Sequence, residues 1–222
     1  LRGHSCASKD SDEMYIFGGY DATNGQFNQT IYKFNPSSAS TAVTTTGHSL
    51  PVGLEYAPAV YDSVGGKFYI FGGYYTNPNA VYSSGIVQYD STTGVATTTG
   101  IGALPKAIGG ASAAYKDSNE IYIFGGYNDT DITFNANIYS FDPSSPSTAA
   151  ADTTYDLPSP GGRRDTSAVY DSNASKFYIF GGFYGTTTVS YVSDIVEYAP
   201  GANGVLKDAF PYELRGSAAA FN

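Results

Sequence analysis

Few side chains in this sequence could do redox, metal or nucleophilic chemistry. The chain has one cysteine, Cys6, and two histidines, His4 and His48, among 222 residues. A single cysteine excludes both an intrachain disulfide and a zinc site of four cysteines. Neither histidine stands in a local motif with a nucleophile and a carboxylate, which a catalytic triad would need. We therefore predict no catalytic residue, no metal site and no cofactor.

Four arginines have a clearer chemical use. A guanidinium forms paired, charge-assisted hydrogen bonds with carboxylates. Arg2, Arg164 and Arg215 each stand at the head of a run of small residues, and Arg163 lies beside the second of them. We predict these four as ligand-binding residues. The alternative is that they form ion pairs with neighbouring acidic turns.

The composition limits the fold and the partners. Net charge is −9, with 11 Lys and Arg against 20 Asp and Glu, so the surface repels phosphate backbones and nucleic acid is excluded as a partner. Tyr (21) and Phe (13) are abundant and favour strands. No window has a sustained helical period, so we expect almost no helix. No apolar run approaches the roughly 18 residues of a membrane span.

An internal repeat organises the whole chain. The string Phe-Gly-Gly begins at Phe17, Phe71, Phe124 and Phe180 and each time ends an apolar run. A strand of small residues precedes each copy, and a Tyr/Phe strand and a Thr-rich or polar stretch follow it. A fifth copy of the small-residue strand, RGSAAAF, occupies residues 215–221. Each repeat therefore predicts four short strands separated by turns.

This pattern resembles the kelch repeat, although the tryptophan usual in that family is missing. The resemblance implies an all-β, kelch-type β-propeller with four visible four-stranded blades and one extra inner strand. We predict a single domain over residues 1–222. Its repeats are expected at about 1–52, 53–106, 107–160 and 161–211, with 212–222 as the start of a fifth repeat or a closing strand.

Three arrangements could accommodate the extra strand. The chain could belong to a larger ring of six or eight blades, or could pass its spare strand to a neighbouring copy and so form an oligomer or filament. It could also close on itself with one terminal strand displaced. The chain begins Leu-Arg-Gly without a methionine or a signal peptide, which we interpret as a mature or excised piece.

The resemblance also implies where a ligand would bind. Arginines of kelch binding domains often point into the central mouth and hold acidic ligands. The loops after each Phe-Gly-Gly are rich in Tyr, Asn, Ser and Gly, a composition suited to contact with peptides or sugars. Tyrosines at the start of these loops are therefore predicted to bind ligand, unless they only pack the strand ends: Tyr20, Tyr74, Tyr75, Tyr127 and Tyr184.

Three N-glycosylation sequons begin at Asn28, Asn128 and Asn173, all in predicted exposed turns. They favour a secreted glycoprotein at the cell surface or outside the cell. We predict a non-catalytic binding or scaffold module that recognises a protein or glycan. One alternative is a structural subunit of an extracellular filament or appendage. The other is a secreted carbohydrate-active enzyme, or a copper oxidase, because some kelch-like propellers resemble galactose oxidase.

Overall fold

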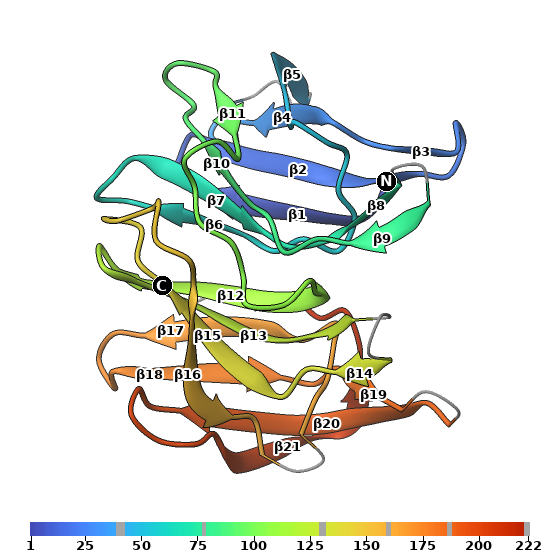
Figure 1. The fold of residues 1–222 in the computed structure, drawn as a ribbon, viewed down its shortest axis with the longest axis vertical. Helices are drawn as coiled ribbons and strands as arrows, with labels where there is room; N and C mark the ends of the chain where they lie inside the picture. Colours follow the sequence, from blue (N-terminus) through green and yellow to red (C-terminus); the bar gives the residue numbers. More distant parts are fainter. Residues whose placement is uncertain (39–42, 77–78, 129–131, 159–160, 186–187, 220–222) are drawn as a thin grey trace.

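The computed structural model describes residues 1–38, 43–76, 79–128, 132–158, 161–185 and 188–219. Within these residues the chain forms strands and no helix (Figure 1). The regular elements are short because turn residues interrupt the chain after each run of Tyr, Phe, Ile and Val. The prediction of an all-β fold is confirmed.

Four antiparallel sheets follow one another along the chain. Blade 1 comprises β1 (Arg2–Ser8), β2 (Met14–Asp21), β4 (Thr30–Phe34) and β5 (Thr44–Ser49), with β3 (Gln26–Phe27) on β2. Blade 2 comprises β6 (Ala59–Asp62), β7 (Lys67–Phe71), β10 (Ile86–Tyr89) and β11 (Ala96–Thr97), with a separate hairpin of β8 (Tyr74–Thr76) and β9 (Ala80–Tyr82).

The second pair of sheets repeats this plan. Blade 3 comprises β12 (Gly109–Asp117), β13 (Glu120–Asn128), β15 (Asn137–Phe141) and β16 (Ala151–Asp156), with β14 (Thr133–Phe134) on β13. Blade 4 comprises β17 (Ser167–Asp171), β18 (Lys176–Phe180), β20 (Ser190–Tyr198) and β21 (Val205–Leu214), with β19 (Phe183–Tyr184) on β20.

The sheets are arranged radially as propeller blades. In Figure 1 two blades fill the upper half and two the lower half, with β1, β6, β12 and β17 toward the middle and β5, β11, β16 and β21 farther out. The inner strands pack in sequence, β1 on β6, β6 on β12 and β12 on β17. No comparable packing joins β17 to β1 among the described residues. The predicted kelch-type arrangement of four blades is confirmed.

The first glycine of each Phe-Gly-Gly lets neighbouring blades approach closely. Gly18 has φ +65°, and a Cβ there would lie 2.2 Å from the carbonyl oxygen of Leu54. The next residue, Gly19, donates its N–H to the same oxygen at 2.6 Å. Only glycine combines a left-handed backbone with this approach, so the repeated motif joins one blade to the segment leading into the next.

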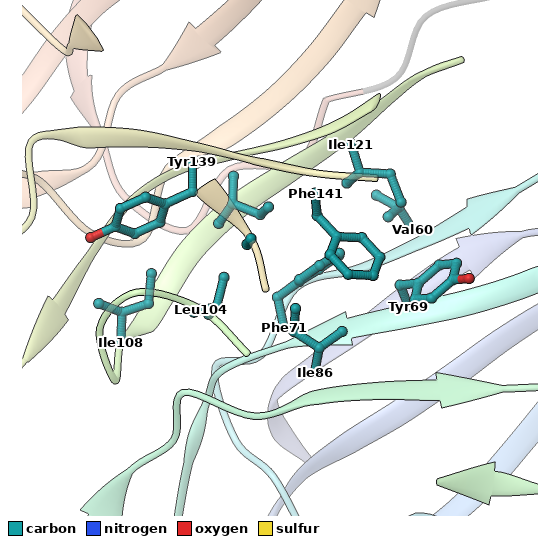
Figure 2. Close-up of a cluster of buried hydrophobic side chains, with 11 residues drawn as sticks. Val60, Tyr69, Phe71, Ile86, Leu104, Ile108, Ile121, Tyr139 and Phe141 are labelled. Carbon is teal, nitrogen blue, oxygen red and sulfur yellow. The ribbon is translucent and has the colours of Figure 1, made fainter. Parts of the chain in front are cut away.

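The core consists of three apolar layers, one between each pair of adjacent blades. Figure 2 shows the layer between blades 2 and 3, where Tyr69 and Phe71 meet Ile121 and Phe141. All four side chains are at most 1% exposed. Burial of one such side chain stabilises a fold by roughly 1.5–3 kcal/mol, so packing between blades is the main force that holds them together.

A run of four backbone hydrogen bonds links the heads of the inner strands from one blade to the next. It passes from Gly3 to Tyr56, Gly110, Asp165 and Gly216, each N–H donating to the preceding carbonyl at 2.6–3.0 Å. All five residues have positive φ, between 56° and 73°. This regularity shows that the five segments occupy equivalent positions around one axis.

The fifth small-residue strand therefore has a defined place. Gly216 continues the run, and Ser217 Oγ lies 3.0 Å from Ser167 Oγ of β17. Residues 215–219 thus lie where the inner strand of a fifth blade would lie, while residues 220–222 are outside the described part of the chain. Arg2–Ser8 keeps the inner position of blade 1 as β1, while residues 215–219 pair with none of the described sheets.

Candidate functional site

The heads of the inner strands surround a cavity of about 460 Å³ on the propeller axis. We call the end of the axis where it opens the mouth. The lining comes from all five inner segments, namely residues 3–6, 56–58, 110–111, 165–166 and 216–218. Small side chains dominate this lining because the five segments converge there. A ligand at the mouth would therefore contact every blade.

The predicted arginines differ in what they contact. Arg2 is 65% exposed and its Nε donates to Oε1 of Glu55 at 2.9 Å, although Glu55 itself is only 2% exposed. Arg215 is 45% exposed and its Nε donates to Oδ2 of Asp165 at 3.0 Å. Both arginines thus pair with a carboxylate of an adjacent segment, as the alternative interpretation expected. Their exposed edges still face solvent.

Arg164 lies within a cage of aromatic rings. Its guanidinium carbon is 5.1 Å from the ring centre of Tyr56, 5.7 Å from that of Tyr127 and 5.5 Å from that of Phe183. Its Nη1 donates to the hydroxyl of Tyr82 at 3.3 Å. Cations over aromatic faces are attracted by the ring quadrupole. Arg164 is therefore held rigidly, with only 13% of its side chain exposed.

Two neighbouring glycines make room for this cage. A Cβ on Gly109 would lie 2.8 Å from the Tyr82 ring, and one on Gly110 would lie 2.7 Å from Oδ1 of Asp165. Asp165 itself has φ +56°, an uncommon conformation for an aspartate. In this conformation its carboxylate accepts from both Arg164 and Arg215. Backbone strain of this kind clusters at functional sites.

Arg163 does not belong to the mouth, so its prediction as a ligand-binding residue is wrong. Its side chain is 0% exposed and lies 3.3 Å from Oδ2 of Asp194. Its carbonyl oxygen accepts the N–H of Gly126. In two other blades, the carbonyl oxygens of Leu54 and Leu214 accept the equivalent glycine N–H. Arg163 therefore fills an apolar position between blades, and burial lowers the pKa of its guanidinium.

Eight aromatic rings form a continuous belt around the mouth, which we call the aromatic belt. In each blade the residue after Phe-Gly-Gly faces an aromatic residue of the returning hairpin strand, and each such pair touches the next. In chain order the belt runs through Tyr20, Phe27, Tyr74, Tyr82, Tyr127, Phe134, Phe183 and Tyr191, with ring centres 4.9–5.9 Å apart.

Only three of the eight belt residues, Tyr20, Tyr74 and Tyr127, were predicted as ligand-binding residues. Their partners Phe27, Tyr82 and Phe134 were not, and neither were Phe183 and Tyr191. Each partner follows seven or eight residues after the first ring and pairs with it in register across the hairpin. That recurring aromatic spacing was a signal in the sequence. Hairpins with variable loops concealed it.

Tyr75 and Tyr184 lie outside the belt. Tyr75 packs against the layer between blades 1 and 2, and Tyr184 follows Phe183 on β19. Successive residues of a strand point to opposite faces, so only one residue of each pair can join the belt. The belt member is the first of the two in both blades. Arg2 adds to the belt, with its guanidinium carbon 4.9 Å from the centre of the Tyr20 ring.

The three sequon asparagines have different surroundings. Asn173 is exposed in the turn between β17 and β18. Asn28 is partly exposed, and its side-chain amide donates to the carbonyls of Gly18 and Thr30. Asn128 is only 6% exposed, with its amide on the carbonyl of Ala107. The expectation of three exposed acceptors is therefore wrong for Asn128, because this asparagine ends β13 inside the fold.

Of the residues considered for catalysis, His4 and Cys6 lie in one cavity and His48 lies apart from them. His4 and Cys6 line the mouth cavity from β1, and Cys6 is exposed. His48 lies on β5, where its Nδ1 is 2.9 Å from the hydroxyl of Tyr89. Within the described ranges, no group of three or more His, Cys, Asp or Glu side chains could hold a metal ion. The same residues include no helix that could cross a membrane.

The fold defines a kelch-type propeller whose inner segments surround an axial cavity. Residues 62–205 match the family described as the KLHDC2/KLHL20/DRC7 Kelch-repeats domain. This stretch is more than half of the chain, so the protein belongs to that kelch-repeat family. Kelch-repeat domains are generally non-catalytic and bind proteins, and this chain is accordingly a protein-binding scaffold module.

The fold also resembles known structures. The chain is similar to a solved protein described as "Structure of YjhT", with a TM-score of 0.76 and 14% sequence identity. The similarity covers 97% of this chain and 72% of that chain. At this identity the comparison shows a shared propeller fold alone. A search among curated proteins found no match.

Proposed function

We propose that the protein is an extracellular binding module that recognises a polypeptide ligand at the mouth. The observation that carries this proposal is the aromatic belt together with caged Arg164. Rigid aromatic rings provide large contact areas at a small cost in conformational entropy. Aromatic residues and arginine are also the residue types that dominate binding energy at protein interfaces.

The charges at the mouth favour a mixed ligand over a purely acidic one. Asp165 pairs with both Arg164 and Arg215, and Glu55 pairs with Arg2, so three arginines share two carboxylates. A strongly acidic ligand would have to compete with carboxylates that are already in place. Apolar or aromatic ligand side chains on the belt, with a single carboxylate near Arg2 or Arg215, fit this arrangement better. Sugar stacking on the same rings is the glycan alternative.

The extracellular part of the proposal rests on Asn173. This sequon lies in a turn between two strands, and its acceptor side chain is exposed. Asn28 is partly accessible, whereas Asn128 is buried and is not part of the proposal. We expect peptide mass mapping of the protein from its natural source to show a glycan on Asn173. An unmodified Asn173 peptide would contradict the glycoprotein assignment.

A peptide selection tests the binding function. Immobilised protein is used to select phage-displayed random peptides, and their affinities are compared for the wild type and for Tyr127→Ala. We expect at least a tenfold loss for this variant, because a hot-spot aromatic contributes about 2 kcal/mol. Tyr115→Ala, a partly exposed tyrosine at the opposite end of the axis, is the control and should bind like the wild type.

Two results would contradict the peptide-binding proposal. One is a set of selected peptides that bind Tyr127→Ala as well as they bind the wild type. The other is a glycan array on which the wild type binds defined sugars while no peptide is selected, which would favour the glycan alternative. Turnover of such a sugar would favour the secreted carbohydrate-active enzyme instead.

A second candidate function is structural. Residues 215–219 continue the hydrogen-bond run at Gly216, yet they belong to none of the sheets in the described part of the chain. This supports a subunit of an extracellular filament or appendage, in which the segment would pair with a neighbouring copy. We expect the protein to self-associate and substitutions in residues 215–219 to abolish that association.

A further inference from the structure

Two residues can reach the first belt ring of each blade, the aromatic residue that follows Phe-Gly-Gly. One is the residue at the head of the inner strand of the same blade, and the other is its equivalent in the next blade. Arg164 makes both contacts, because its guanidinium carbon is 5.5 Å from the ring centre of Phe183 in its own blade and 5.7 Å from that of Tyr127 in the preceding blade. Arg215 likewise lies 4.5 Å from Phe183. These head residues therefore decide which charge lies over each ring.

In blades 1, 3 and 4 an arginine of the chain itself lies over the first ring. Arg2 lies over Tyr20 of its own blade, with the guanidinium carbon 4.9 Å from the ring centre. Arg164 lies over the first rings of blades 3 and 4. A cation over an aromatic face is attracted by the quadrupole of the ring. The fold thus makes the same kind of contact at three of its four blades.

Blade 2 departs from this pattern. The head residues that could reach its first ring, Tyr74, are Glu55 in the same blade and Gly109 in the next. One is a carboxylate and the other has no side chain. All 11 Lys and Arg residues of the chain lie within the described ranges, and none of them lies over the Tyr74 ring. Blade 2 therefore has the ring without the cation.

A hollow of about 370 Å³ lies beside this ring, between blades 1 and 2. Tyr74 packs on Phe27 of β3 with ring centres 5.7 Å apart, and both rings are partly exposed. Phe27 and Thr76 line the hollow, together with the side chains of Gln26 and Gln29. Thr76 follows Tyr74 by two residues on β8, so their side chains share one face of that strand. In Figure 1, β3 and β8 lie on the same side of the two upper blades.

The groups around the hollow suit a cationic side chain. Within the described part of the chain, no lysine or arginine lines it. The amide oxygens of Gln26 and Gln29 and the hydroxyl of Thr76 can accept hydrogen bonds. Asp21 stands opposite Gln26 in the β2–β3 hairpin and adds a negative charge. A guanidinium stacks on aromatic rings through its planar face and has five N–H donors, so it can use the rings and these acceptors together.

We propose that an arginine side chain of the polypeptide ligand binds over Phe27 and Tyr74, with its guanidinium at this hollow. The pattern of head residues carries the inference, since the other three first rings hold an arginine of the chain while Tyr74 has a carboxylate and a glycine beside it. The inference rests on the proposed function, peptide binding at the mouth, and deepens it by naming one residue of the ligand. This arginine complements the ligand carboxylate expected near Arg2 or Arg215.

A titration with a small probe tests the site directly. Protein with carbon-13 in its Phe and Tyr rings is titrated with Nα-acetyl-arginine amide and followed by NMR. We expect the rings of Phe27 and Tyr74 to shift and to saturate in the millimolar range. Nα-acetyl-citrulline amide, a neutral analogue of the same shape, should bind about threefold more weakly, because it lacks the cation. The equivalent rings of blade 3, Tyr127 and Phe134, should not shift, since Arg164 already lies over Tyr127.

Matched variants locate the binding. Phe27→Leu keeps an apolar side chain but removes the ring, and it should weaken binding of the arginine amide by about threefold. Phe134→Leu makes the same change at the equivalent, partly exposed position of blade 3 and should bind like the wild type. Thr76→Arg changes an exposed residue and places a guanidinium of the chain itself at the hollow, so it should abolish binding of the probe.

Three outcomes of the titration would overturn the proposal. The first is an absence of shifts at Phe27 and Tyr74 up to about 50 mM arginine amide, well above the dissociation constant of a weak contact. The second is equal binding of the citrulline and arginine amides, which would mean that the charge contributes nothing. The third is an equal response of Tyr127 and Phe134, which would mean that the probe binds aromatic rings without preference.

The peptide selection separates this inference from the proposed function. Selected peptides should contain arginine more often than the starting library. Peptides whose affinity depends on Tyr127 but that contain no arginine would refute the arginine site and leave the peptide-binding function intact. Shifts at Phe27 and Tyr74 with no selected peptide would refute the peptide-binding function and not the cation site.

Discussion

The two ends of the propeller axis are built from the same strands but differ in character. At the mouth, the heads of the inner strands carry Arg2, Glu55, Gly109 and Arg164 at equivalent positions, so charge and size change from blade to blade. At the opposite end, the inner hairpins turn on an aspartate in all four blades. Asp10, Asp62, Asp117 and Asp171 each accept a backbone N–H two residues on.

This contrast separates structure from function within one repeat. An aspartate that accepts a backbone N–H two residues on forms an Asx turn, which sets the hairpin and needs no ligand. The cavity at that end, about 310 Å³, is lined mainly by alanine, valine and tyrosine. At the mouth, Tyr56 and Asp165 take the positive φ that glycine takes at the equivalent position of the other segments, so residue type changes there while the backbone repeats. The aspartates of the regular end therefore serve the hairpins themselves, whereas the side chains that differ between blades gather at the mouth.

The largest expected effect on stability comes from replacing a glycine by alanine at each end of the axis. Gly125→Ala places a Cβ 2.4 Å from the carbonyl oxygen of Arg163 at φ +71°. We expect a loss of about 3 kcal/mol or more in the free energy of unfolding, because left-handed strain and a backbone clash add. Gly66, at the opposite end, has φ +69° and open space around it. For Gly66→Ala we therefore expect a loss of only about 1 kcal/mol in the free energy of unfolding.

Urea unfolding of both glycine variants measures this difference. The midpoint should fall much further for Gly125→Ala than for Gly66→Ala, with unchanged slopes. Equal losses would mean that close approach of blades at the Phe-Gly-Gly motif contributes little. The backbone at the Phe-Gly-Gly motif would then be no more constrained than the turns at the opposite end.

The next effect concerns the cation in the aromatic cage. Arg164→Lys keeps the charge but removes the planar group that three rings surround, and we expect stability to fall by about 1 kcal/mol. Lys116→Arg, at an ion pair near the opposite end, is the matched exchange and should change stability by less than about 0.5 kcal/mol. Thermal unfolding followed by circular dichroism distinguishes them, and similar shifts would argue against a specific cage.

The smallest effect is a pH dependence located at the regular end. Hydrogen bonds from Lys33 and Lys9 lower the pKa of Glu13 to about 2. A carboxyl with a lowered pKa in the folded state stabilises the fold above its unfolded pKa of about 4.3. That contribution is lost as pH falls from about 4.3 toward 2. We expect Glu13→Gln to flatten the stability profile in this window by up to about 1 kcal/mol.

Unfolding midpoints measured at several pH values between about 5 and 2 test the assignment to Glu13. Glu213→Gln, which neutralises an exposed carboxylate on β21, is the control and should leave the profile unchanged. An identical acid profile for Glu13→Gln and the wild type would show that the Lys9 and Lys33 pairs add no stability. The acid response would then have to arise elsewhere.

Much of the fold was predictable because it is periodic. Four Phe-Gly-Gly strands at nearly equal spacing, each with a small-residue strand before it and a Tyr/Phe strand after it, require four similar sheets. The same periodicity predicted that Arg2, Arg164 and Arg215 occupy one position, and that 215–221 repeats an inner strand. These inferences use only local patterns and their repetition, which a sequence states directly.

Other properties were decided only by tertiary packing. Arg163 and Arg164 are neighbours in sequence, yet one fills an apolar site between blades and the other enters the aromatic cage. Asn128 matches a sequon but is buried by the segment at Ala107. Phe27 and Tyr82 join the belt through contacts between blades. Neighbours distant in the chain determine burial, pairing and direction, and no local pattern specifies which distant residues those will be.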